Sequence, residues 1–428
     1  MIGSLFVSEE DIMRNMTLKQ AARTTPVVSM TDTLELIDLP KMREYRLERL
    51  REEMKHQNVG GVVLTSAYSI RYATGMRDAG IMQGHIPLSY LFVAAEGPTV
   101  YFDGETGKAV ANGLETIDEL GDEAIHLSFM FSGSRIDEMI QKWVNQISGL
   151  MQRHGGDSQR IGVESPVPQV ALLFAEKGIE VVHAAIVTEP ARTIKSVEEI
   201  LCMNYAIAIA EDGMWRMREA LRPGITEIEL WSILWKANVE AGGDWIEGRL
   251  LAAGDRTNPW LQEASGRIIR PGELVAFDTD MVGPFGYSAD VSRTLLCGSG
   301  KPTDYQRELY QRAYEEVHSN MELMLPGMEF REITEKGFKQ PEKFQDQHYA
   351  VMAHGIGMSD EWPCIYYPQD ESLIYDGVLE PGMCICVESY VGEVGGAEGV
   401  KLEEQILITE DGYEVLSKFP FEDNLLGI

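Results

Sequence analysis

The spacing of apolar and polar residues divides most of the chain into alternating helical and extended segments. The segment after Pro40 combines a helical period with i,i+4 charge pairs and leads into a short apolar run at residues 60–64. Strand-like runs at residues 90–94 and 100–102 are followed by a further helical stretch. This alternation predicts an α/β domain over residues 39–188.

Residues 1–38, in contrast, have few apolar positions at a regular spacing. We expect them to form an irregular N-terminal arm, suited to packing on a partner subunit.

The pattern changes in the remainder of the chain, residues 189–428. Residues 193–196 are suited to cap a long helix that runs to about Leu221, where Pro223 and Gly224 break it. A second amphipathic helix follows, and after Pro271 the pattern is mainly that of strands around one further helix. The sequence therefore predicts an α+β fold with two domains. The predicted later elements are helices at 226–241 and 304–325 and strands at 274–280, 288–296, 383–389 and 400–408.

Composition narrows the class of protein. The 428 residues are 44% apolar and 25% charged, which supports two domains with ordinary cores. No apolar run approaches the roughly 20 residues that cross a bilayer, and the first residues do not resemble a secretory signal, so we expect a cytoplasmic protein with no membrane contact. A formal charge of −31 argues against nucleic acid as a partner. The five cysteines contain no CxxC pair, and Cys384 and Cys386 alternate in a strand-like run, so buried thiols are favoured over ligands.

Acidic residues inside the predicted strands are the main chemical signal. Asp278 ends an apolar strand, and Asp290 follows a Gly-Pro-Phe-Gly turn on what should be the neighbouring strand of a hairpin. Because strand side chains alternate, Asp280 is expected on the same face as Asp278. Acids among apolar strands are unfavourable without a cation or hydrogen-bond partners, so this group predicts metal coordination, with turn-capping acids as the alternative.

Three further donors lie downstream: His354, Glu388 and Glu403. Each of them alone is more often structural than catalytic. Together with the three aspartates they provide enough oxygens to hold two divalent ions. Carboxylates with one imidazole suit iron, manganese, cobalt or zinc, and the ligand types do not choose among these.

Five motifs in order resemble those of the creatinase, prolidase and methionine aminopeptidase superfamily, which has the pita-bread fold. The resemblance implies a creatinase-like N-terminal domain followed by a pita-bread metal-binding catalytic domain. It implies that Asp278, Asp290, His354, Glu388 and Glu403 are ligands, with Asp290 and Glu403 as bridges, and that Glu404 is not a ligand. The motifs are a linker at 192–200, the strand motif at 286–294, HGIG at 354–357, EPGM at 380–383 and a GVRIED-like run at 399–404.

The departures from this superfamily concern the histidines that its peptidases place near substrate. Residues 258–261 read Asn-Pro-Trp-Leu where the peptidases have a histidine, and Asp360 stands near the position of a second one. With the extra Asp280, this set is similar to the DddP-type dimethylsulfoniopropionate lyases, an offshoot of the superfamily. That similarity implies two metal ions, expected to be iron, a homodimer, and a small zwitterionic sulfonium substrate that is cleaved to dimethyl sulfide and acrylate.

The proposed elimination needs a base near the substrate and a site for the sulfonium cation. Asp360 is our candidate base, with Glu361 as the alternative, and Tyr349 is a second catalytic candidate because it lies five residues before His354. Aromatic faces bind onium cations, although each of these aromatics alone is more often a core residue. Arg293 is expected to support the strands electrostatically. The candidate substrate-binding aromatics are Trp362, Tyr366 and Trp260.

Two other functions remain open on this evidence. One is an Xaa-Pro metallopeptidase or a creatinase-like C–N hydrolase, which the missing histidines disfavour. The other is a non-catalytic binding module, which retention of all five ligands disfavours.

Overall fold

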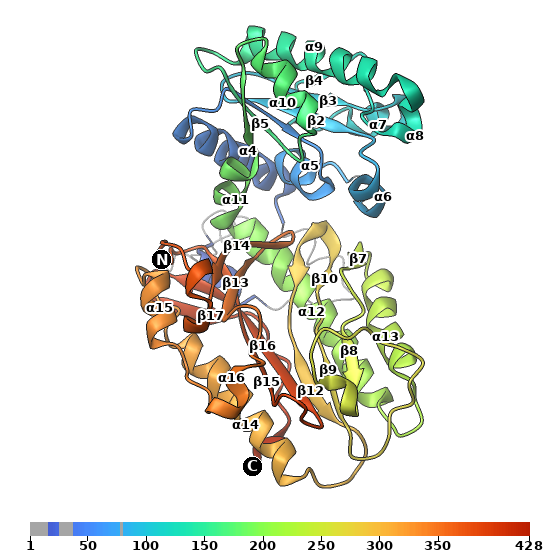
Figure 1. Cartoon of the computed structure of the whole chain (residues 1–428), viewed down its shortest axis with the longest axis vertical. Helices are drawn as coiled ribbons and strands as arrows, with labels where there is room; N and C mark the ends of the chain where they lie inside the picture. The colour runs from blue at the N-terminus through green and yellow to red at the C-terminus, as the bar shows by residue number, and fades with distance from the viewer. Residues whose placement is uncertain (1–15, 25–36, 78–79) are drawn as a thin grey trace, which may run out of the picture. The chain divides into compact units, whose positions relative to one another are not determined.

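The computed structural model describes residues 16–24, 37–77 and 80–428. The described chain forms two compact units, one of residues 38–192 and one that joins the described residues up to 37 with residues 193–428 (Figure 1). Most of the predicted N-terminal arm lies outside the described residues. The described part of that arm contains one short helix, α2 (Leu18–Ala22), which packs on α12, β16 and β17 of its own unit.

The unit of residues 38–192 is built on a six-stranded mixed sheet with the order β4-β3-β2-β1-β5-β6. Strands β1, β5 and β6 are parallel, whereas β2 is antiparallel to both of its neighbours. The amphipathic helix α9 packs Trp143, Val144 and Ile147 into the same core as Phe92 of the sheet. The strands are β1 (Gly61–Leu64), β2 (Tyr90–Ala94), β3 (Thr99–Phe102), β4 (Glu119–Leu120), β5 (Arg160–Val163) and β6 (Glu180–His183); the α-helices are α4 (Leu39–His56), α5 (Ala67–Thr74), α6 (Gly80–His85), α7 (Glu105–Ala111), α8 (Phe129–Ser132), α9 (Ile136–His154), α10 (Pro168–Ala175) and α11 (Ala185–Thr193).

The helices of the other unit begin at sequence signals that are easy to recognise. Ser196 caps α12: its hydroxyl accepts from the Glu199 amide, and the Glu199 carboxylate accepts from the Ser196 amide. The helix ends before Pro223 and Gly224, and Gly224 adopts the left-handed φ of +98° that the turn requires. The α-helices are α12 (Val197–Ala220), α13 (Glu227–Glu240), α14 (Asp304–Met321), α15 (Phe330–Lys336), α16 (Glu342–Gln345) and α17 (Asp423–Leu426).

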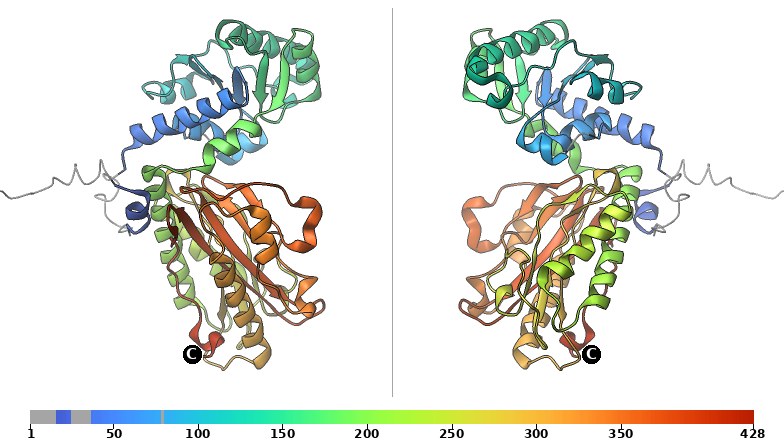
Figure 2. Two further views of the ribbon diagram at one scale, coloured as in Figure 1. Left: turned by 90° about the vertical axis from the view of Figure 1, so that its left-hand side faces the viewer. Right: turned by 90° about the vertical axis from the view of Figure 1, so that its right-hand side faces the viewer.

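Three antiparallel sheets make up the rest of this unit. A five-stranded sheet has the order β14-β13-β15-β16-β17, and two three-stranded sheets have the orders β12-β9-β8 and β11-β10-β7. Figures 1 and 2 show its long strands flanked by α12 and α13 on one side and by α14 on the other. The strands are β7 (Trp245–Ile246), β8 (Leu251–Ala253), β9 (Leu274–Phe277), β10 (Met281–Val282), β11 (Ser288–Ala289), β12 (Arg293–Leu296), β13 (Ala353–Ile356), β14 (Asp360–Ile365), β15 (Cys384–Gly392), β16 (Gly399–Thr409) and β17 (Gly412–Val415).

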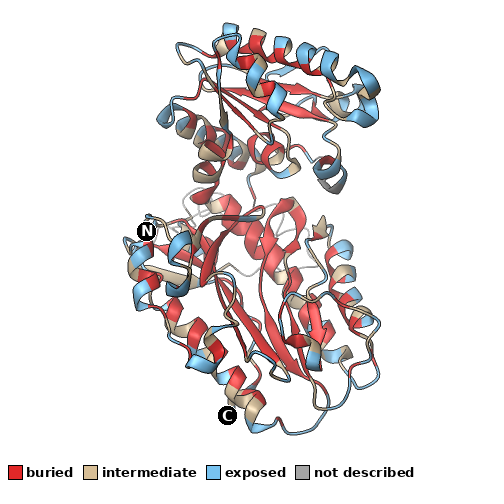
Figure 3. Cartoon of the chain, viewed as in Figure 1, coloured by how far each residue is buried: buried red, intermediate tan, exposed pale blue. Residues whose placement is uncertain are grey.

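The core of this unit lies between α14 and the strands β15 and β16. Leu309, Ala313 and Val317 of α14 pack in one cluster with Val387 and Leu402 of the sheet. Each such fully buried aliphatic side chain contributes about 1.5–3 kcal/mol relative to exposure. Figure 3 shows these strands buried along their length, while the outer faces of the helices are exposed. Strands β15 and β16 are therefore held rigidly by close packing.

Two predicted strands differ from the structure. The segment predicted as one strand at 288–296 forms β11 and β12, with a break at residues 290–292, and the strand predicted at 274–280 is shorter than expected. Strand β9 ends at Phe277, and Asp280 has a positive φ of +35°, so the alternation expected from Asp278 to Asp280 does not apply there. In the described part of the chain, no helix has both the length and the apolar character needed to span a membrane.

Candidate metal centre

Two long strands of the five-stranded sheet bring four polar side chains to one face. Glu388 of β15 lies directly opposite Glu403 of β16. Cys386 and Lys401 precede them by two residues each, so strand alternation places all four on the same face. His354 of β13 pairs with Cys386 across the next strand boundary. The pairing register of β13, β15 and β16 therefore sets the positions of these side chains, which form one side of the site.

A hairpin brings the aspartates close to these side chains of the five-stranded sheet. Asp278 follows β9, and Asp290 follows β11 on the returning chain. Between them, the Thr279 hydroxyl donates to the Ala289 carbonyl at 2.8 Å and accepts from the Val291 amide at 2.9 Å. Oxygen atoms of Asp278, Asp280 and Asp290 lie within 4.8 Å of one another. The structure thus brings the three aspartates together, although Asp280 arrives through a turn and not through an extended strand.

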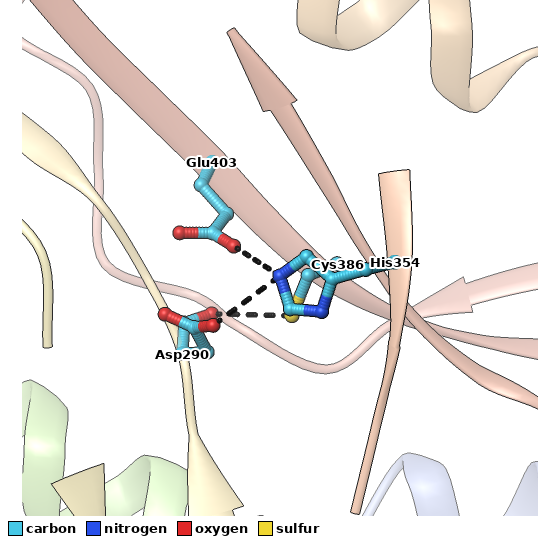
Figure 4. A group of neighbouring side chains, drawn as sticks. All are labelled: Asp290, His354, Cys386 and Glu403. Atoms are coloured by element: carbon cyan, nitrogen blue, oxygen red, sulfur yellow. Dashed lines mark hydrogen bonds and ion pairs between the residues drawn. The ribbon is translucent and has the colours of Figure 1, made fainter. Parts of the chain in front are cut away.

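His354 points its Nε2 atom at the carboxylates, as Figure 4 shows for Asp290 and Glu403. Nε2 lies 3.1 Å from Glu388 Oε1, 3.6 Å from Asp290 Oδ2 and 3.8 Å from Glu403 Oε1. The other ring nitrogen, Nδ1, is 2.9 Å from the Gly355 carbonyl, so a neutral, metal-binding ring would carry its proton on Nδ1. Nε2 is then the atom available to a metal.

Lys401 is a buried cation within the cluster, and the sequence alone did not indicate it. Its Nζ lies 2.7 Å from Glu388 Oε2, 3.2 Å from Asp278 Oδ2 and 3.4 Å from Glu403 Oε2, and donates to the Ser292 hydroxyl at 2.7 Å. The available signal was its position two residues before Glu403 on one strand.

The electrostatics of the cluster require more positive charge than Lys401 supplies. Burial raises the pKa of Asp280, Asp290 and Glu403, and neighbouring carboxylates raise it further. One buried oxygen on each of Asp278, Asp290, Glu388 and Glu403 accepts no hydrogen bond from the described residues. With Asp280, five carboxylates and one ammonium leave four negative charges. Two divalent cations would balance these charges and satisfy the unpartnered oxygens, so the residues fit a two-metal centre.

Cys386 also faces this cluster. Its sulfur can approach the ligand atoms of Asp290, His354 and Glu403, and it lies 3.8 Å from the Asp290 carbonyl. Burial and the adjacent carboxylates raise the pKa of the Cys386 thiol well above its usual range. Cys386 therefore lies beside the metal-binding atoms, and it was not among the predicted ligands.

The two candidate bases have opposite environments. The Asp360 side chain is 72% exposed, and its Oδ1 lies 4.0 Å from His354 Nδ1. Glu361 is buried, with Oε2 2.9 Å from Lys195 Nζ and Oε1 accepting from the Met358 amide. Glu361 is therefore committed to a buried ion pair, and Asp360 is the acid that borders the site.

Tyr349 and Trp260 lie together beside the cluster. Lys401 Nζ is 4.4 Å from the centre of the Tyr349 ring, and Tyr349 packs against the small cluster that contains Trp260 and Tyr390. Trp362 packs on Phe330 at 5.4 Å, and Tyr366 approaches Tyr375 at 6.2 Å. Of the predicted aromatics, Tyr349 contacts the cluster through Lys401, and Trp260 packs beside Tyr349.

Asn258, which stands where the peptidases have a histidine, has a structural role here. Asn258 occupies a loop in which its amide donates to the Glu393 and Gly396 carbonyls at 2.8 and 3.0 Å.

Arg293 is fully buried and lies 2.6 Å from Glu404, whose carboxylate also accepts from the Ser417 hydroxyl. This pair holds β12 against β16, in agreement with the electrostatic role expected for Arg293.

The fold and this site together define a metalloenzyme of the pita-bread class. The model of metallopeptidase family M24 matches residues 201–410, and that of the creatinase/prolidase N-terminal domain matches residues 46–194. Among solved structures, dipeptidase PepE from Mycobacterium ulcerans superposes with a TM-score of 0.71 at 20% identity, over 90% of this chain and 98% of that one. The Xaa-Pro dipeptidase from Bacillus anthracis gives 0.69 at 23% identity, over 89% and 99%. The predicted α+β fold class is confirmed.

Sequence relatives place the chain more closely. The dimethylsulfoniopropionate lyase DddP of Roseovarius nubinhibens is 37% identical over 93% of this chain and 90% of its own length. The DddP of Roseobacter denitrificans is 35% identical over the same shares. This chain belongs to the DddP family within the M24 metalloenzymes, which confirms the resemblance seen in its motifs.

Proposed function

We propose that this chain is a metal-dependent carbon-sulfur lyase that cleaves dimethylsulfoniopropionate to dimethyl sulfide and acrylate. The observation that supports it most is an exposed carboxylate, Asp360, 4.0 Å from a metal-site imidazole, in a chain 37% identical to a DddP lyase. An acid in this place suits abstraction of a carbon-bound proton better than it suits binding of a peptide.

The chemistry follows from the side chains at the site. Asp360 takes a proton from the carbon next to the substrate carboxylate. The electrons of that C–H bond form the C=C bond of acrylate, and the C–S bond breaks with its electron pair going to sulfur, which leaves as neutral dimethyl sulfide. Asp360 then returns the proton to solvent, which its exposure permits.

The proposed ligands are the six residues of the cluster. Bound divalent ions would neutralise the charge that develops on the substrate carboxylate. Iron is our proposal for both ions because the resemblance to the DddP-type lyases implies it; the carboxylate and imidazole donors suit iron, as they suit manganese, cobalt and zinc. The ligands are Asp278, Asp280, Asp290, His354, Glu388 and Glu403.

The sulfonium group needs a site with aromatic faces. Tyr349 and Trp260 are our first candidates because they lie beside the cluster, and Tyr349 already covers the Lys401 ammonium. Trp362 lies on β14 two residues after Asp360, and Tyr366 directly follows that strand, so we include both.

The proposal extends to the assembly and location of the protein. We expect a homodimer in the cytoplasm. Light scattering during gel filtration should give twice the mass of the chain, and a monomer mass would contradict the dimer. Fractionation of the source cells tests the location.

The activity is tested by incubating the iron-loaded protein with dimethylsulfoniopropionate and measuring dimethyl sulfide in the headspace and acrylate in solution. An Xaa-Pro dipeptide assayed in parallel tests the alternative hydrolase, which the dipeptidase-like fold favours. We expect equal amounts of dimethyl sulfide and acrylate and no dipeptide cleavage. Cleavage of the dipeptide without gas release would overturn the lyase assignment.

A further inference from the structure

Lys401 contacts three of the proposed ligands in a pattern that goes beyond the balance of charge. Its Nζ lies 3.2 Å from Asp278 Oδ2, 2.7 Å from Glu388 Oε2 and 3.4 Å from Glu403 Oε2. The other oxygen of each carboxylate, Asp278 Oδ1, Glu388 Oε1 and Glu403 Oε1, is buried and accepts no hydrogen bond from the described residues. Each of these three side chains therefore has one oxygen that faces Lys401 and one that does not.

The oxygens that do not face Lys401 lie on the side of the imidazole ligand. Glu388 Oε1 is 3.1 Å and Glu403 Oε1 is 3.8 Å from His354 Nε2. Figure 4 shows Glu403 in this orientation, with one oxygen directed at the His354 ring and the other directed away from it. Oxygen atoms of Asp278, Glu388 and Glu403 also lie within 4.8 Å of one another. These oxygens therefore converge on the place where the proposed ions would bind.

Lys401 is itself held by neighbours that are not proposed ligands. Its Nζ donates to the Ser292 hydroxyl at 2.7 Å, and that hydroxyl donates to Glu403 Oε2 at 2.7 Å. The Tyr349 ring covers Nζ, with its centre 4.4 Å away. Lys401 and Ser292 are both fully buried. Because buried side chains pack closely, these contacts restrict where Nζ can lie, and Lys401 can in turn fix the carboxylates that it touches.

We propose that Lys401 is a positioning residue of the metal centre, which holds one oxygen each of Asp278, Glu388 and Glu403 and thereby turns the other oxygen toward the ions. The inference rests on the proposed metal centre, although not on the reaction carried out there. Partners that orient metal ligands in this way contribute about 10–100-fold to metal affinity. The alternative is that the ammonium only repels the ions, in which case its removal would tighten metal binding.

Replacing Lys401 by Met separates these two effects by their sign, because methionine keeps an unbranched side chain that suits a buried position and removes the ammonium. The measurement is the dissociation constant of Mn²⁺, obtained by competition with a chelator at fixed pH on the full-length protein. We expect Lys401→Met to weaken Mn²⁺ binding by about 10–100-fold. Ser292→Ala, which removes only the hydroxyl between Lys401 and Glu403, should weaken it by a smaller factor.

The matched control is Lys195→Met, which removes a second buried ammonium whose partner, Glu361, is not a proposed ligand. Both lysine variants should lose stability because a buried carboxylate loses its partner, but only Lys401→Met should lose metal affinity. If Lys401→Met does not fold, Ser292→Ala carries the same test. Unchanged or tighter Mn²⁺ binding by the Lys401 or Ser292 variant, or an equal loss in Lys195→Met, would refute the positioning role. Failure of the unmodified protein to bind Mn²⁺ would instead overturn the proposed metal centre itself.

Discussion

At the scale of single residues, neighbouring acids in one strand have different environments. Asp360 and Glu361 alternate in direction along β14, so one is exposed near His354 and the other is buried against Lys195. The sequence could name both acids but could not choose between them. The choice depends on Lys195, which is 166 residues away in the chain.

Replacing Asp360 by Asn should lower kcat for dimethylsulfoniopropionate by about 10²–10⁴-fold, the usual contribution of a general base. Because Asp360 is exposed and is not one of the proposed ligands, metal content and Tm should stay near those of the unmodified protein. The matched control is Glu361→Gln, which leaves Lys195 buried without its partner and should lower the free energy of unfolding by about 3–5 kcal/mol. Full activity of Asp360→Asn in the headspace assay would remove its role as base.

Glu316 should make stability depend on pH. Burial raises its pKa to about 7, against 4.5 when exposed, while Ser389, Gln340, Tyr367 and His348 face it and oppose that shift in part. Between these two values the folded state binds more protons than the unfolded state, so its contribution is complete below pH 4.5 and is lost as pH rises through 7. Linkage gives about 3 kcal/mol for this shift.

The measurement is the difference in the free energy of unfolding between Glu316→Gln and the unmodified protein, from urea denaturation. The difference should move in favour of the variant by about 3 kcal/mol between pH 4.5 and pH 8. A difference that does not change with pH would show that Glu316 has an ordinary pKa.

The proposed ligands illustrate what the sequence can predict at this scale. Asp278, Asp290, His354, Glu388 and Glu403 stand in motifs with fixed spacing, and the structure brings them together. Lys401 was missed because its position two residues before Glu403 points to the site only once the strand and its carboxylate partners are known. Trp362 and Tyr366 follow Asp360 in sequence, but their neighbours Phe330 and Tyr375 come from other segments, which sequence spacing does not show.

At the scale of elements, helices were predicted well where side chains mark their ends. Ser196 begins α12, Thr226 begins α13, and both form a capping box with the glutamate three residues later. Strand boundaries were less accurate, because hydrogen bonding to distant strands decides them. Strand β9 ends at Phe277, where pairing with β8 and β12 ends, although its apolar pattern predicted a longer strand.

Replacing Ser196 by Ala should lower the free energy of unfolding by about 1 kcal/mol, because the Glu199 amide at the start of α12 loses its acceptor. Ser196→Asp, which keeps an acceptor, should recover most of this loss. Thermal or urea unfolding measures both. Equal stability of the alanine variant and the unmodified protein would show that the cap contributes nothing to α12.

At the scale of the whole molecule, two units that differ in architecture share one chain. The unit of residues 38–192 has a mixed sheet with its own core, and the proposed metal centre lies wholly within the other unit. The sequence placed a boundary near residue 189, where the first α/β segment ends and the capping residues 193–196 begin a long helix. The composition of the core of each unit could not be deduced, since it depends on contacts between distant segments.

Removal of metal by a chelator should abolish lyase activity and lower Tm at pH 8, because the carboxylates would then repel one another. Binding at 100 times Kd stabilises the folded state by about 2.7 kcal/mol for each ion, which sets the expected scale. Restoring Fe²⁺ should recover both quantities. A chelated protein with unchanged Tm and full activity would argue against a metal at this cluster.

The contacts of Lys401 bear on whether the protein folds before or after it binds metal. Its ammonium already holds Asp278, Glu388 and Glu403 in place, so the chain is expected to fold before any ion arrives. Metal loading would then be a late step on a finished scaffold. The identity of the incorporated metal would follow from the supply inside the cell, and a preparation from a foreign host would be open to mismetallation without any sign of misfolding.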